Sequence, residues 1–211
     1  MTTLLGLLSL LCTIAAFAVY LHDTFKKGVR PHVMTWLAFG GFTTVGWLIQ
    51  VQKGAGPGGW ALGLTSAGCL IVSGASLGKQ IQEHEKWWWF PRIDWIWLAI
   101  SVAIFCLYLR FPNHPTVAAI LTTLADLAAY GPTIDQGWRN PYRDCIPAFF
   151  LNSVKFIPVL LALLVLQVFS IATALYPASL FAMNLFVAWL LRHRRRQFTR
   201  AEEQKSRGAT L

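Results

Sequence analysis

The chain has 211 residues, of which 55% are hydrophobic and 13% are charged, with a formal net charge of +9. Soluble domains carry about 25% charged residues, so this composition excludes an ordinary soluble protein and favours an integral membrane protein in a lipid bilayer. The basic residues are divided among short segments between apolar runs, which argues against a nucleic-acid partner. We therefore interpret the positive charge as a signal of membrane topology.

Apolar runs predict seven membrane-spanning helices, because about 20 apolar residues in a helix cross the hydrocarbon core. The predicted helices span residues 2–21, 33–51, 60–78, 93–110, 116–133, 146–166 and 171–191. We interpret the first as a helix and not a signal peptide, since Met1–Thr3 has no basic residue. No charge occurs between Phe156 and Leu191, which is too long for one span, so we place a turn near Gln167–Ser170.

A short motif occurs twice, after the first and after the fifth predicted helix. Thr24–His32 and Thr133–Tyr142 both follow the pattern T-x-x-x-G-x-R with a proline after it, and their starts lie 109 residues apart. The repeat predicts two related three-helix bundles joined by the fourth helix as a linker. Because the linker is a single helix, the two bundles would be parallel, a plan known among transporters. The expected fold is therefore an all-α membrane protein of seven helices, arranged 3+1+3.

The expected organisation follows from this repeat. Residues 1–78 form the first repeat, 79–115 a cytoplasmic loop and the linker helix, 116–191 the second repeat, and 192–211 a basic cytoplasmic tail. Nearly all Lys and Arg residues follow the odd-numbered helices, and the positive-inside rule places that side in the cytoplasm. The N-terminus is therefore expected outside and the C-terminus inside, in a bacterial inner membrane or a plasma membrane.

The repeated motif has two interpretations. In the structural one, its glycine, Gly28 or Gly137, allows a sharp turn after a helix, and its proline starts the next helix. In the functional one, prolines on this side form a cytoplasmic gate or hinge. The candidate gate residues are Pro31, Pro132 and Pro147.

Two patterns in the second half are similar to those of a known family. Pro132-Thr133 ends the fifth helix, and Ile146–Leu151, IPAFFL, opens the sixth; Trp47 lies in the second helix. With the 3+1+3 layout, these residues resemble the SWEET and PQ-loop superfamily, whose second repeats carry Pro-Thr and Met-Pro-Phe-Phe and whose helix two often carries a tryptophan. No Pro-Gln dipeptide occurs and no asparagine follows Pro177, so the resemblance is to a divergent member. It implies a small membrane transporter.

Asp126 is the most informative candidate, because it lies about ten residues into the fifth helix, near the bilayer centre. A charge there costs at least a few kcal/mol unless it faces the bundle interior, a partner or a water-filled cavity. Tyr130 lies one turn later on the same face, and Phe17 occupies the matching position of the first half. Lys155, with Asn152 one turn before it, lies at a similar depth in the sixth helix. Asp126 and Lys155 either neutralise each other structurally or line a solute pathway.

Three further residues are candidates for a pathway. Trp36 and Trp47 lie in the second helix, and Asn184 lies in the seventh. Aromatic walls with a few polar groups suit a small-molecule pocket, although packing is the alternative for each tryptophan.

These features predict a transporter or facilitator for a small solute, such as a sugar, an amino acid or a vitamin-like molecule, that works by alternating access. Proton coupling and homo-oligomer formation stay open. The alternative is a non-transporting receptor or assembly protein, because fold does not decide function. Scattered histidines and the lack of phosphate-loop or nucleophile motifs predict no enzyme, no metal and no cofactor.

Overall fold

The computed structural model describes residues 1–82, 92–108, 110 and 114–208. The helices are α1 (Thr2–Lys26), α2 (Val33–Gln52), α3 (Trp60–Gln82), α4 (Arg92–Tyr108), α5 (Pro115–Ala129), α6 (Gly131–Arg139), α7 (Ile146–Val154), α8 (Phe156–Val165) and α9 (Ile171–Gly208), with 3₁₀ turns η1 (Gly56–Gly59) and η2 (Pro141–Arg143). The predicted all-α class is confirmed. The predicted loop before the linker helix falls on residues 83–91, outside the described part.

Five helical segments are long and apolar enough to cross a membrane, which is consistent with an integral membrane protein. They are Thr2–Lys26, Gly56–Gln82, Pro115–Arg139, Ile146–Val165 and Ile171–Arg200. α5 and α6 are separated by Tyr130 alone, and α7 and α8 by Lys155 alone, so each pair forms one nearly continuous rod. The predicted turn near Gln167–Ser170 is confirmed, because α8 ends at Val165 and α9 begins at Ile171.

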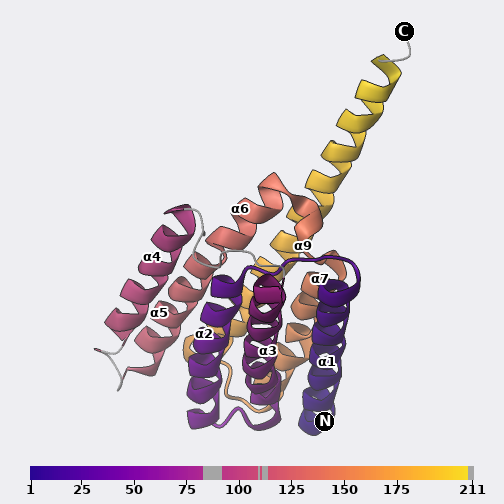
Figure 1. The fold of residues 1–211 in the computed structure, drawn as a ribbon. Coiled ribbons are helices and arrows are strands. Elements are labelled where there is room, and N and C mark those ends of the chain that lie inside the picture. Colours follow the sequence, from indigo (N-terminus) through magenta and orange to yellow (C-terminus); the bar gives the residue numbers. More distant parts are fainter. Residues whose placement is uncertain (83–91, 109, 111–113, 209–211) are drawn as a thin grey trace.

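The helices fall into two sets, α1–α3 and α5–α9, with similar contacts within each set. α3 packs against both α1 and α2, and α9 packs against both α5 and α7. Between the sets, α1 contacts α7 and α8, while α2 contacts α5. α4 packs mainly against α5 at the edge of the bundle, and α1, α3, α5 and α9 run in one direction (Figure 1).

The two copies of the repeated motif differ in structure. Gly28 has a φ of +71° just after α1, as a sharp turn requires. Gly137 instead lies inside α6, so the predicted loop Thr133–Tyr142 is helical as far as Arg139. A Cβ at Gly137 would come within 2.9 Å of Leu191, so this glycine permits close packing of α6 against α9. The predicted glycine turn is therefore right for the first copy and wrong for the second.

The seventh predicted helix continues well beyond its expected end. α9 runs from Ile171 to Gly208, so most of the predicted tail, 192–211, is helical, and it projects from the bundle (Figure 1). The physical reason is that no glycine or proline interrupts residues 178–207, and Arg, Gln, Glu and Lys are good helix formers.

Several segments that carry basic residues meet at one end of the bundle. It is the end from which α9 projects (Figure 1). The loop Lys27–His32, the connection Asn140–Cys145 and the stretch Arg192–Arg196 meet there through backbone and side-chain hydrogen bonds. We call it the basic end.

A glycine in α3 generates a stability prediction. A Cβ at Gly68 would come 2.5 Å from the ring of Phe17, whereas one at Gly74 would meet nothing within 4 Å. We expect Gly68→Ala to lower the free energy of unfolding by about 1–3 kcal/mol, the usual cost of overpacking. Gly74→Ala is the matched control and should be neutral or stabilising by up to about 1 kcal/mol, because alanine favours helix. Thermal unfolding in detergent measures both, and equal midpoints for the two variants would contradict the predicted contact.

Candidate functional site

A central cavity lies between the two sets of helices. Its lining comes from α1, α2 and α3 on one side and from α5, α7, α8 and α9 on the other, and every lining residue is buried. The lining residues are Phe17, Trp36, Phe39, Thr43, Thr65, Cys69, Asp126, Tyr130, Asn152, Lys155, Phe156, Leu180 and Asn184. The centre of a water-sized sphere can occupy about 20 Å³ of the cavity, which is room for one or two water molecules.

Lys155 occupies the junction of α7 and α8 and has no exposed surface. Its Nζ donates hydrogen bonds to Thr65 Oγ1 at 2.6 Å and to Asn152 Oδ1 at 2.7 Å. The same atom lies 5.0 Å from the ring centroid of Phe156 and 5.4 Å from that of Phe17. These are suitable partners for a buried ammonium group. Because an ammonium group has three donors, one is left without a partner among the described residues.

Asp126 reaches the same cavity from α5. Its Oδ1 atom is buried and has no hydrogen-bond partner in the described structure. The hydroxyl groups of Thr122, one turn earlier, and of Tyr176 on α9 are also buried without partners there. Tyr176 faces Asp126 without reaching hydrogen-bond geometry. Since buried polar atoms are normally satisfied, this cluster has unused capacity to bind a hydrogen-bond donor.

The two charged candidates line one cavity but do not pair. The ion pairs among the described residues do not include one between Asp126 and Lys155. Lys155 is held instead by Thr65 and Asn152, as described above. The structure therefore shows no self-neutralising pair, and a role of both residues in solute binding stays a prediction.

A second polar pair in the cavity joins α5 to α9. Asn184 Nδ2 donates to the hydroxyl of Tyr130 at 3.0 Å and to the carbonyl of Leu180 at 2.8 Å. The ring of Tyr130 also packs on Phe39 of α2, with centroids 4.3 Å apart. Both candidate residues therefore line the cavity, and Tyr130 connects the two sets of helices.

The two candidate tryptophans differ in position. Trp36 lines the cavity and packs against Tyr20 and Phe17, with ring centroids 4.7 and 6.1 Å away. Trp47 is not among the lining residues. Its ring packs on α3, where a Cβ at Gly63 would lie 3.0 Å from it, so the glycine leaves room for the indole.

Sequence reasoning missed Thr65, which bonds directly to Lys155, and Cys69 one turn later. Threonine and cysteine are common in apolar helices, so neither residue stands out. Their four-residue spacing, on a helix rich in small residues, is a weak signal because small residues also serve helix packing.

The three candidate gate prolines occupy different settings. Pro31 lies in the loop between α1 and α2, and its carbonyl accepts a hydrogen bond from Ser76 Oγ at 2.7 Å. Pro132 lies in the first turn of α6, directly after the break at Tyr130, and Pro147 lies in the first turn of α7. Proline suits a first helical turn because no N–H bond is lost. These positions fit the structural interpretation, and a gate role stays a prediction.

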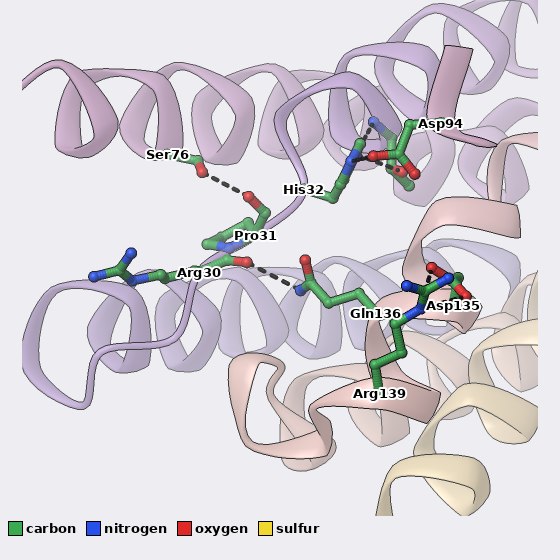
Figure 2. A network of polar contacts seen from close by, with 9 residues as sticks. Arg30, Pro31, His32, Ser76, Asp94, Asp135, Gln136 and Arg139 are labelled. Carbon is green, nitrogen blue, oxygen red and sulfur yellow. Dashed lines mark hydrogen bonds and ion pairs between the residues drawn. The ribbon is translucent and has the colours of Figure 1, made fainter. Parts of the chain in front are cut away.

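Hydrogen bonds tie the first loop to the second set of helices at the basic end (Figure 2). The carbonyl of Arg30 accepts from Gln136 Nε2 at 3.1 Å, and the Arg30 N–H donates to the carbonyl of Arg143 at 2.9 Å. His32 Nε2 lies 2.9 Å from Asp94 Oδ2, which joins the loop to α4. The two copies of the repeated motif are therefore bonded directly to each other.

A buried layer of hydrogen bonds lies beneath this loop and joins α1 to the start of α7. The Tyr20 hydroxyl donates to Asp144 Oδ1 at 2.6 Å, and Cys145 Sγ donates to Asp23 Oδ2 at 3.2 Å. Tyr20 also packs on Trp36 of the cavity lining. The buried layer therefore lies between the cavity and the basic end.

Comparison of the chain with models of protein families, with curated proteins and with solved structures found no match. Within the described residues, no group of three or more His, Cys, Asp or Glu side chains is arranged to hold a metal ion.

Asp144 generates a pH prediction. Burial raises the pKa of its carboxyl group from 3.8 to about 6, although hydrogen bonds from Tyr20 and Cys145 and the charge of Arg195 oppose the shift. The unfolded chain releases this proton at a lower pH than the folded protein does. The folded state therefore loses stability as the pH rises from about 4 through about 6, by roughly 3 kcal/mol in total.

Replacement of this carboxyl by an amide, Asp144→Asn, removes the titration. Relative to the variant, the wild-type protein should become less stable between pH 4 and pH 6.5, as measured by thermal unfolding in detergent. Asp135→Asn, at the exposed Asp135–Arg139 ion pair, is the control and should keep the wild-type pH dependence. The prediction would be contradicted if the difference in stability between the wild-type protein and Asp144→Asn stayed constant from pH 4 to pH 6.5.

Proposed function

We propose that this protein is a membrane transporter or facilitator for a small solute, and that the solute binds in the central cavity. One observation carries the proposal: Asp126 and Lys155 are both buried in one cavity between two sets of helices and do not pair with each other. Burial of ionisable groups in a membrane-spanning bundle is costly, and such groups usually mark substrate or ion pathways.

The packing order of the helices supports a 3+1+3 architecture. The third helix of each set, α3 or α9, packs against the other two helices of its set, and the sets meet through α1 with α7–α8 and α2 with α5. Parallel repeats of this kind hold substrate near the midplane between the halves, with alternating access by rocking. The resemblance of Pro132-Thr133 and Ile146–Leu151 to the SWEET and PQ-loop superfamily supports the same plan.

The basic end is the cytoplasmic end in this proposal, because of the positive-inside rule. On that side the cavity is closed by bonds such as Arg30–Gln136 and Tyr20–Asp144. The cavity has room for one or two water molecules, so it must widen before a larger solute can bind. Opening toward the cytoplasm requires these bonds to break and the two sets of helices to separate.

The cavity favours a polar solute. Asp126 offers an unpartnered acceptor, Lys155 offers an unused donor, and aromatic rings form much of the wall. Sugars, amino acids and vitamin-like molecules carry the complementary donors and acceptors. A proton that binds to Asp126 would couple transport to the proton gradient.

Uptake into proteoliposomes tests this function. We expect the reconstituted protein to accumulate at least one solute from a panel of sugars, amino acids and vitamins. Asp126→Asn and Lys155→Met should each lower the initial rate about tenfold or more, because each removes a charged group to which the solute would hydrogen-bond. Asp135→Asn and Lys53→Met remove the same charges at less buried positions outside the cavity and should leave the rate unchanged.

Uptake should be measured with and without a pH gradient, which separates a coupled transporter from a passive facilitator. If the wild-type protein moves none of the solutes, the transporter proposal fails. A change of peptide or protein binding in Asp126→Asn would then favour the alternative, a receptor or assembly protein.

A further inference from the structure

A basic pocket lies on the surface, where the projecting part of α9 passes the start of α7. It measures about 450 Å³. It is lined by Ile146, Arg192, Arg195, Arg196, Thr199 and Arg200. We call it the arginine pocket. Four of its six lining residues are arginines and none is acidic, so the pocket attracts an anion.

Three of the arginines share one exposed face of α9. Arg192, Arg196 and Arg200 recur every four residues, so they lie on one face of α9, and all three are exposed. Among the residues that the structure describes, they have no hydrogen-bond or ion-pair partner. Like charges at this spacing destabilise a helix, and a bound anion removes that repulsion.

The fourth arginine is fixed in place. Arg195 Nε donates to the carbonyl of Pro141 at 3.0 Å, and its Nη2 donates to the carbonyl of Asp144 at 2.6 Å. Its guanidinium group lies 5.3 Å from the ring centroid of Tyr142. Both acceptors are neutral carbonyls, and the Asp144 carboxyl accepts from Tyr20 instead. Arg195 therefore forms an ordered wall of the pocket.

The start of α7 adds to the positive electrostatic potential of the arginine pocket. Ile146 is the first residue of α7, and the first turn of this helix contains no acidic residue. The N-terminus of a helix carries partial positive charge and favours anions, phosphate in particular. The guanidinium groups and the helix end therefore favour the same kind of ligand, a phosphate group.

Exposed aromatic side chains near the pocket favour a position at the level of lipid headgroups. On α9 the exposed apolar side chains Leu185, Phe186 and Trp189 end three residues before Arg192. Trp138 and Tyr142 are also exposed at this end, with 53% and 49% of their surface accessible. Exposed aromatic side chains mark the boundary between hydrocarbon and headgroups. The phosphate available at this level of a bilayer is that of a phospholipid.

We propose that the arginine pocket binds the phosphate headgroup of an anionic phospholipid. The acyl chains of this lipid lie along the exposed apolar face of α9 that includes Leu185, Phe186 and Trp189. This binding is independent of the transport proposed above, because it uses no residue of the central cavity. Basic pockets at the cytoplasmic side of membrane helices commonly bind such headgroups.

The test compares two triple variants of the full chain in detergent. The pocket variant carries Arg192→Gln, Arg196→Gln and Arg200→Gln. The matched control carries Lys26→Gln, Arg92→Gln and Arg139→Gln, which remove the same charge from exposed positions at the same end. Binding of phosphatidylglycerol and phosphatidylcholine is measured by titration and by native mass spectrometry, and thermal unfolding confirms that both variants are folded.

We expect the wild-type protein and the control to prefer phosphatidylglycerol over phosphatidylcholine. The pocket variant should bind phosphatidylglycerol about 100-fold more weakly, since each basic residue near a membrane surface contributes about fivefold. Equal losses in both variants would show diffuse surface charge and overturn the proposal. It would also be overturned if inorganic phosphate or a short RNA bound with the same arginine dependence and the lipid did not.

Discussion

The hydrogen bond from Lys155 to Thr65 is the contact on which the interior of the bundle depends. It joins the junction of α7 and α8 to α3, and so connects the two sets of helices inside the cavity. A fully buried ammonium group without such partners would be strongly destabilising, so Thr65 and Asn152 must face it. Their oxygen atoms leave Asp126 without a cation, which creates the unpartnered acceptor that defines the candidate site.

The two sets of helices are similar in packing and different in chemistry. Phe17 and Asp126 lie 109 residues apart, the same separation as the two motif copies, and both line the central cavity. Equivalent positions thus supply an aromatic ring from one set and a carboxyl group from the other. The motif copies diverge in the same way, because Gly28 makes a turn while Gly137 lets α6 approach α9. The carboxyl group of the cavity therefore comes from a position at which the two sets of helices differ.

The basic end has two separate structural features. Inside the bundle, the backbone carbonyl of Arg30 accepts from Gln136 and the Tyr20 hydroxyl donates to Asp144, so loop and helix ends are bonded to each other. Outside it, Arg192, Arg196 and Arg200 stay exposed on α9 and form the arginine pocket.

The sequence by itself determined the all-α class, the positions of the apolar helices and the turn between α8 and α9, because apolar length is a local property of the chain. It also placed the charged residues Asp126 and Lys155 within apolar helices. It could not show that Thr65 bonds to Lys155, that Trp47 packs on α3 outside the cavity, or that Gly137 is helical. Only the tertiary structure decided these points. Partners of a buried polar group are chosen by helices far apart in sequence, and a glycine's role depends on which side chain approaches it.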